Sequence, residues 1–150
     1  MLPLFQLPSS RRDLMGPLQF KSRRSLLLVF VHDGGCDLCR NLLLGLAEHY
    51  PDYQAEEAEL LAVAPVQPAE AERLATDLNL PFPVLADADG AIHRRYGAVA
   101  LARLSGVAIF LADRYGEVQQ RWLAEDGHTA LPGLGALVDD LRFLGIQCPE

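Results

Sequence analysis

The sequence has little that would suit a membrane protein, an exported protein or a nucleic-acid-binding protein. No apolar run approaches the roughly 20 residues that a helix needs to cross a bilayer. The N-terminal stretch MLPLFQLPSS lacks the charged segment and the long apolar segment of a signal peptide. Acidic residues outnumber basic ones by 20 to 13, which gives a formal net charge of −7. We therefore expect neither a nucleic acid nor a membrane as a partner.

Cysteine is scarce, and its distribution argues against a metal site. The 150 residues contain three cysteines, Cys36, Cys39 and Cys148, and four histidines. A structural zinc site needs four well-spaced ligands, and no two histidines have zinc-finger spacing. We expect no metal and no cofactor. Few cysteines without an export signal indicate a cytoplasmic protein, and in that reducing compartment a C-x-x-C pair is more often catalytic than structural.

The stretch around which the chain is organised is SLLLVFVHDGGCDLCR, residues 25–40. It begins with an apolar run, Leu26 to Val31, whose length and composition are typical of a strand buried on both faces. Two glycines precede the C-x-x-C, and after it apolar residues recur at three- and four-residue steps as far as Tyr50. The pattern predicts a buried strand, a sharp turn, and a helix over about 36–50 that Pro51 ends.

A C-x-x-C pair at the start of a helix is suited to thiol chemistry. The N–H groups and the positive dipole end of the first turn stabilise a thiolate, the form that attacks disulfides and peroxides. We expect the pKa of Cys36 to lie below that of a free cysteine, with Arg40 adding a cation. Cys39, one helical turn further on, can close a disulfide with Cys36. An alternative is a pair of ordinary buried cysteines that act as small hydrophobic residues.

The rest of the chain alternates strands and helices and ends with a hairpin and a helix. We interpret residues 1–24 as a loosely structured lead-in or an edge hairpin, with a short strand at 18–20. The patterns predict strand 59–66, a helix from Pro68, strand 82–86, a helical turn over 92–96 that ends at Gly97, strand 106–112, a turn at 113–116, strand 118–123 and a helix over 134–146. We therefore predict one α/β domain over residues 1–150, with a mixed central sheet and helices on both faces.

Three stretches of the sequence carry a resemblance to a known family. They are LLLVFVHDGGCDLCRNLLLGL, LNLPFPVLADADGAIHRRYGA and VAIFLADRYGEVQQRW. Together with the order of elements, they resemble the thioredoxin fold, and more specifically its redoxin branch, the peroxiredoxin-like alkyl hydroperoxide reductase/thiol-specific antioxidant family. The similarity spans residues 25–145. It implies a thioredoxin-like fold, an antioxidant enzyme, a disulfide or peroxide substrate, and an external thiol reductant such as a thioredoxin or glutathione system.

The chain departs from that family at positions that matter for peroxide chemistry. Peroxidatic cysteines in the family follow a P-x-x-x-T/S-x-x-C pattern, whereas Asp33 and Val29 stand three and seven residues before Cys36. The arginine expected at the later strand is replaced by Val107-Ala108, in the region where plain thioredoxins place a cis-proline. The motif DGGCDLC also resembles that of another small family of thiol–disulfide oxidoreductases.

Thiol–disulfide exchange is the leading hypothesis for the activity. Cys36 would attack a substrate disulfide, and Cys39 would resolve the mixed disulfide to an internal bridge. His32 and Asp33 are candidates for proton relay at the mouth of the site, although His32 can equally be held by the backbone and Asp33 can cap the helix. The resemblance makes two further residues candidates for the substrate groove, namely Gly106 and Val107.

Two alternatives stay open. One is a thiol peroxidase, in which Cys36 is oxidised to a sulfenic acid that condenses with Cys39 or Cys148. The missing threonine and arginine count against it, because rapid peroxide reduction needs positioned donors on the leaving oxygen. The other is a non-catalytic binding module that kept the fold and lost the chemistry. A homodimer is compatible with the sequence in each case.

Overall fold

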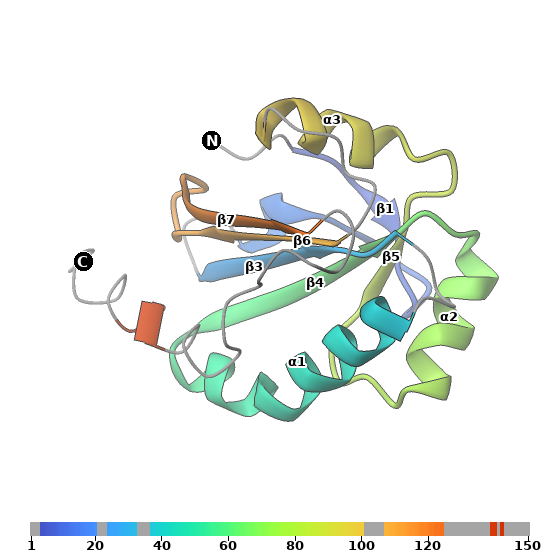
Figure 1. Ribbon diagram of the computed structural model, residues 1–150, viewed down its shortest axis with the longest axis horizontal. Coiled ribbons are helices and arrows are strands. Elements are labelled where there is room, and N and C mark those ends of the chain that lie inside the picture. The colour runs from blue at the N-terminus through green and yellow to red at the C-terminus, as the bar shows by residue number, and fades with distance from the viewer. Residues whose placement is uncertain are drawn as a thin grey trace.

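The computed structural model describes residues 4–20, 24–32, 37–100, 107–124, 139, 140 and 142. Within these ranges, five strands form one sheet in the order β5-β4-β3-β6-β7 (Figure 1). The strands are β3 (Ser25–Phe30), β4 (Ala58–Ala64), β5 (Val84–Ala86), β6 (Val107–Ala112) and β7 (Val118–Ala124). The first three run parallel, whereas β6 is antiparallel to β3, and β7 is antiparallel to β6. The predicted mixed sheet is confirmed.

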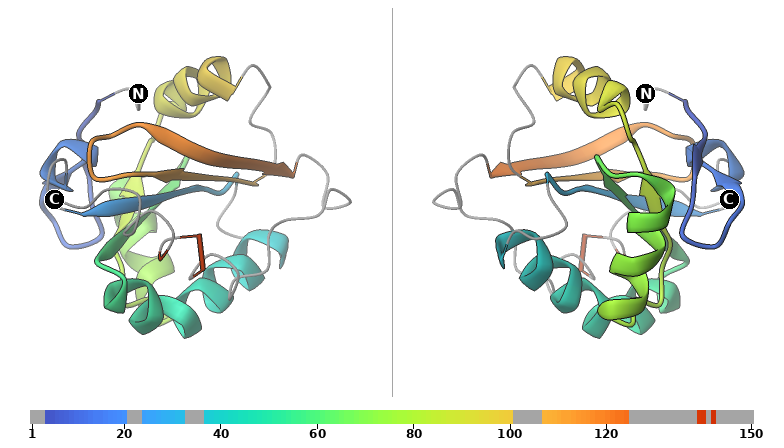
Figure 2. Two further views of the ribbon diagram at one scale, coloured as in Figure 1. Left: turned by 90° about the vertical axis from the view of Figure 1, so that its left-hand side faces the viewer. Right: turned by 90° about the vertical axis from the view of Figure 1, so that its right-hand side faces the viewer.

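The central strand β3 is buried on both faces, as its apolar run predicts. The side chains of Leu26 to Val31 are each 3% exposed or less. Because side chains alternate along a strand, Leu27, Val29 and Val31 join one buried cluster, and the residues between them join another. The first cluster is covered by α1 (Asp37–Ala55) and α2 (Pro68–Asp77), and the second by α3 (Ala91–Ala100), so helices lie on both faces of the sheet (Figures 1 and 2).

The predicted end of α1 at Pro51 is wrong. The helix continues through Pro51 to Ala55. A proline inside a helix removes one backbone hydrogen bond and costs about 3 kcal/mol. The turn beyond it places Tyr53 in the core at 0% exposure, and burying a large aromatic side chain offsets a cost of that order. Tertiary packing therefore overrides the local stop signal.

Two further local predictions are also wrong. The helical turn expected to end at Gly97 is a full helix, α3, that runs on to Ala100. Tyr96 and Ile92 on α3 are buried against the sheet, so packing holds the helix past its glycine. The short strand expected at 18–20 is instead part of a 3-10 helix, η1 (Pro17–Phe20), which begins on a proline whose fixed φ suits a helical first turn.

The N-terminal segment forms a small hairpin at the edge of the sheet. Strands β1 (Leu7–Pro8) and β2 (Leu14–Met15) pair antiparallel. Ser10 donates its backbone N–H to the Val84 carbonyl and accepts from the Val84 N–H at its side-chain oxygen, at 2.8 and 3.0 Å. These bonds cover the outer edge of β5, which would otherwise present unpaired groups. Of the helix predicted over 134–146, only residues 139, 140 and 142 lie within the described ranges, and they are helical. The single domain stays a prediction.

Tyr96 lies at the centre of an aromatic cluster under α3. Its ring centroid lies 4.8 Å from that of Phe30, 5.3 Å from that of Phe110 and 5.7 Å from that of Phe5. Burial raises the pKa of the Tyr96 phenol above its ordinary value, and the nearby Arg95 opposes that shift. The folded protein therefore binds this proton more tightly than the unfolded chain does.

Substituting Tyr96→Phe is expected to flatten the loss of stability at alkaline pH. The unfolded phenol ionises near pH 10 while the folded one stays protonated, so the free energy of unfolding falls as the pH rises through that value. Removing the group should reduce the slope by about 1.4 kcal/mol per pH unit, the contribution of one proton. Urea unfolding at a series of pH values measures this slope, and the comparison at neutral pH isolates the cost of the lost hydroxyl. An unchanged slope would contradict the buried, protonated phenol.

Candidate functional site

Four strand ends meet at one edge of the sheet. Because β3, β4 and β5 are parallel, their carboxyl ends lie together, and the residues that follow them are Val31, Pro65 and Asp87, with His32 next after Val31. The antiparallel β6 begins at the same edge with Val107, since Ala108 pairs with Phe30 near the end of β3. Helix α1, which carries Cys39, also begins here (Figure 1). In open α/β sheets, this carboxyl edge is the usual position of a reaction site.

The Cys39 thiol is buried beside an exposed imidazole. Cys39 lies in the first turn of α1 and is 1% exposed, whereas His32, just past the end of β3, is exposed. The distance from Cys39 Sγ to His32 Nδ1 is 3.4 Å. An imidazole at this distance can accept the thiol proton or donate to a thiolate. A shielded sulfur whose proton can pass to solvent through His32 is suited to the second, resolving step of thiol chemistry.

The structure says less about the other predicted site residues. Cys36, Asp33 and Gly106 lie outside the described residues. Arg40 is half-buried on α1, one residue after Cys39. Val107 is 1% exposed and belongs to the same buried cluster as Cys39, so it forms part of the floor of this edge. Its role in a substrate groove stays a prediction.

No metal-binding group is seen in the part of the chain that the structure describes. Within it, no three His, Cys, Asp or Glu side chains are grouped so that they could hold an ion. Nor is any helix in those ranges long and apolar enough to cross a bilayer.

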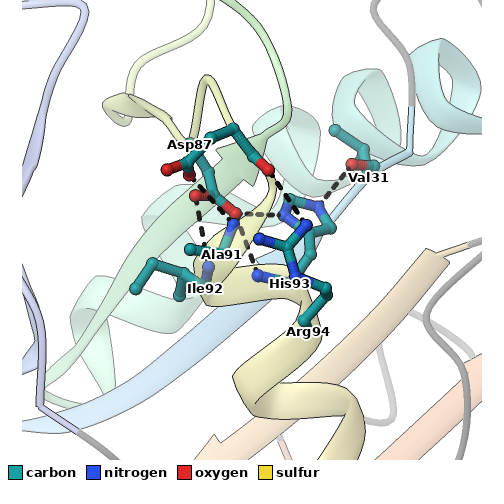
Figure 3. A network of polar contacts seen from close by, with 7 residues as sticks. Val31, Asp87, Ala91, Ile92, His93 and Arg94 are labelled. Atoms are coloured by element: carbon teal, nitrogen blue, oxygen red, sulfur yellow. Dashed lines mark hydrogen bonds and ion pairs between the residues drawn. The ribbon is translucent and has the colours of Figure 1, made fainter.

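A buried polar network that the sequence patterns did not reveal lies behind this edge (Figure 3). His93, on the first turn of α3, is 7% exposed, and Asp87, just after β5, is 1% exposed. The His93 ring places Nδ1 2.7 Å from Asp87 Oδ2 and Nε2 3.0 Å from the carbonyl oxygen of Val31. The network therefore joins α3 and the end of β5 to the end of β3, one residue before His32.

Asp87 also caps the helix that carries His93. Its two carboxylate oxygens accept hydrogen bonds from the backbone N–H groups of Ile92 and His93, at 3.2 and 2.9 Å. These are N–H groups that the helix itself leaves without a carbonyl partner. Between β5 and α3 the chain turns over Asp87–Gly90, where the N–H of Gly90 bonds to the Asp87 carbonyl at 2.9 Å. The feature of the sequence that could have indicated the buried network is an acidic residue at a strand end, Asp87, followed six positions later by a histidine, His93.

Substituting Asp87→Ala should destabilise the fold more than the neighbouring substitution Asp89→Ala. Asp89 is exposed and makes one capping bond, to the N–H of Ala91 at 3.0 Å. We expect the free energy of unfolding to fall by about 3–5 kcal/mol for Asp87→Ala, because a buried charged partner is removed. For Asp89→Ala the expected loss is about 1 kcal/mol, that of a helix cap. Chemical denaturation measures both, and equal losses would contradict the buried network.

Comparisons with known proteins find one matching family and several similar proteins. The model of the AhpC/TSA family matches residues 2–121. The chain is 25% identical over 130 residues to alkyl hydroperoxide reductase E of Mycobacterium bovis, and to that of Mycobacterium tuberculosis, covering 85% of both chains in each case.

Solved structures share the fold. One is AhpC of Enterococcus faecalis, with a TM-score of 0.81 and 18% identity, covering 99% of this chain and 93% of that one. Another is peroxiredoxin Q of Xanthomonas campestris, with a TM-score of 0.76 and 18% identity, covering 93% of this chain and 90% of that one. The predicted thioredoxin-like fold is thereby confirmed.

Proposed function

The chain belongs to the AhpC/TSA family, as its redoxin resemblance predicted, and is an antioxidant oxidoreductase; from this we propose that it is a thiol peroxidase that reduces hydroperoxides with Cys36 and Cys39. The name of its Mycobacterium relatives supports this choice over disulfide exchange, which was the leading hypothesis from the sequence. The observation that carries the proposal is the buried Cys39 thiol at 3.4 Å from the His32 imidazole, at the carboxyl edge of the sheet, where reaction sites usually lie.

The first step oxidises Cys36. Its thiolate attacks the terminal oxygen of the hydroperoxide, so that an S–O bond forms as the O–O bond breaks. The departing alkoxide takes up a proton and leaves as an alcohol, and Cys36 becomes a sulfenic acid. The expected low pKa of Cys36 at the helix start serves this step, because only the thiolate attacks.

The second step closes the pair. The Cys39 sulfur attacks the sulfenic sulfur, a disulfide bond forms, and hydroxide leaves. His32 takes the proton from Cys39 Sγ, and with that proton the hydroxide departs as water. Burial protects Cys39 from oxidation by peroxide in solution, which keeps it available for resolution. Asp33 and Arg40 are candidates for further electrostatic support of this step.

An external reductant resets the site. A dithiol of the thioredoxin type or two molecules of glutathione would reduce the Cys36–Cys39 disulfide by exchange, and both are supplied in a reducing cytoplasm. We keep that location and a homodimer as part of the proposal. Light scattering of the reduced and oxidised protein measures the mass of the assembled particle.

Thiol–disulfide exchange is the second candidate, favoured by a specific feature of the sequence. The family's threonine before the peroxidatic cysteine is absent, since Asp33 stands at that position. Val107-Ala108 replace its arginine. A C-x-x-C pair needs neither group in order to exchange disulfides. The two candidates share both cysteines, so the substrate that reacts rapidly decides between them.

We expect reduced protein to react with hydrogen peroxide and cumene hydroperoxide at neutral pH at least about tenfold faster than free cysteine does, because a lowered pKa at the helix start keeps more of Cys36 as the thiolate that attacks. Trp122 is the only tryptophan and packs against the cluster that contains Cys39. Its fluorescence in a stopped-flow instrument should therefore report both the oxidation and the closure of the pair.

Three serine variants serve as matched controls. Cys36→Ser should abolish both fluorescence phases, Cys39→Ser should leave the first and remove the second, and Cys148→Ser should change neither. Peroxide reactivity no faster than that of free cysteine, together with rapid exchange with oxidised dithiothreitol, would replace the peroxidase proposal with disulfide exchange. Slow reaction with both reagents would contradict each proposal.

A further inference from the structure

The hydrogen-bond ladder between β3 and β4 stops for a chemical reason. Val31, next after β3, donates its N–H to the Val63 carbonyl at 3.0 Å. In a parallel ladder, a residue that donates its N–H to one carbonyl of the partner strand accepts, at its own carbonyl, from the N–H two residues further along that strand. That position is Pro65, which has no N–H. The ladder therefore offers no donor to the Val31 carbonyl, although Val31 is fully buried.

His93 supplies the missing donor. Its Nε2 lies 3.0 Å from the Val31 carbonyl oxygen, across 62 positions of sequence (Figure 3). A carbonyl oxygen only accepts, so Nε2 must carry a proton. The other ring nitrogen faces the Asp87 carboxylate at 2.7 Å and donates to it. The His93 and Phe30 rings also make a T-shaped contact, with centroids 5.0 Å apart and planes at 88°, which further fixes the orientation of the His93 ring.

The Val31 carbonyl is covalently coupled to the thiol site. It belongs to the peptide unit that joins Val31 to His32, and because that unit is planar, fixing its oxygen fixes the direction in which the His32 backbone leaves the strand. His32 Nδ1 is in turn 3.4 Å from Cys39 Sγ. A short path thus runs from the Asp87–His93 pair through one peptide group to the resolving thiol.

We propose that His93 is a positioning residue for the thiol pair: by donating to the Val31 carbonyl in place of the absent Pro65 N–H, it holds the His32 imidazole against Cys39. This inference rests on the proposed function in treating Cys39 as the resolving thiol. His93 touches no substrate and acts only through the strand end. Its effect should appear in the closure of the Cys36–Cys39 disulfide.

Two substitutions of His93 separate positioning from folding. In His93→Gln the side-chain amide nitrogen reaches as far as Nε2 and can still donate to Val31. In His93→Asn it reaches only as far as Nδ1, so the bond to Asp87 can form and the bond to Val31 cannot. Pro65→Ala restores a backbone N–H at the ladder position. The double substitution His93→Asn with Pro65→Ala therefore tests whether the strand can recover its own donor.

The closure rate is measured with the chromogenic disulfide DTNB at equimolar concentration, in full-length protein carrying Cys148→Ser. The Cys36 thiolate attacks DTNB, forming a mixed disulfide and releasing one thionitrobenzoate. Cys39 then displaces the second thionitrobenzoate as the internal disulfide forms, so the second phase reports Cys39 without any peroxide. We expect His93→Asn to slow the second phase at least about fivefold, the effect of losing one hydrogen bond to a positioned group. His93→Gln and the double variant should keep most of the parent rate.

Several outcomes would overturn the inference: equal slowing by Asn and Gln, an unchanged rate in His93→Asn, no recovery in the double variant, or no second phase in the parent. If His93→Asn does not fold, nitrogen NMR of the parent protein decides, because the inference requires a proton on His93 Nε2. A normal DTNB pattern combined with slow peroxide reduction would overturn the peroxidase proposal and leave the positioning role of His93 intact.

Discussion

The end of the ladder between β3 and β4 is the constraint on which the rest of this structure depends. Strand β3 lies at the centre of the sheet with both faces buried, so it cannot shift its register without moving its apolar side chains out of the core. The chain leaves that fixed strand at Val31. Whatever chemistry follows is therefore presented from a rigid base, which is what a site that must bring two sulfur atoms together requires.

One carboxylate links the helix on the far face of the sheet to this strand end. Asp87 accepts from two backbone N–H groups at the start of α3 and from the ring of His93. The helix is thereby capped, and its histidine is directed at the Val31 carbonyl. A buried charge is tolerated here because its oxygens are bonded on several sides. The cap, the edge of the sheet and the thiol site form one connected unit.

The sequence predicted the parts of this structure that depend on local pattern. The apolar run at 26–31 and the alternation of strands and helices were sufficient for the mixed sheet, and three family-like stretches were sufficient for the redoxin family. The errors fall where distant packing overrides a local signal, as at Pro51, where the buried Tyr53 keeps the helix going. The role of His93 could not be predicted from the sequence, because its hydrogen-bond partner, Val31, lies 62 positions away.

In the candidate site, too, the sequence predicted what depends on local pattern and not what depends on distant packing. His32 and Cys39 could be selected from their place beside the strand end, and the structure brings their side chains to 3.4 Å. The burial of Cys39 beside an exposed imidazole depended on how α1 packs onto the sheet, which spacing alone does not determine. The departures from the family pattern at Asp33 and Val107 could be seen at once. Their effect on peroxide chemistry is a question of rates.

The most direct test of the account is peptide mapping by mass spectrometry of the fully reduced protein after one equivalent of hydroperoxide, with rapid alkylation of the remaining thiols. The account predicts a disulfide between Cys36 and Cys39, with Cys148 alkylated. A disulfide that joins Cys36 to Cys148 or to a second chain, or a sulfinic acid at Cys36 with Cys39 still alkylated, would contradict the claim that the pair at the end of β3 is the reaction centre.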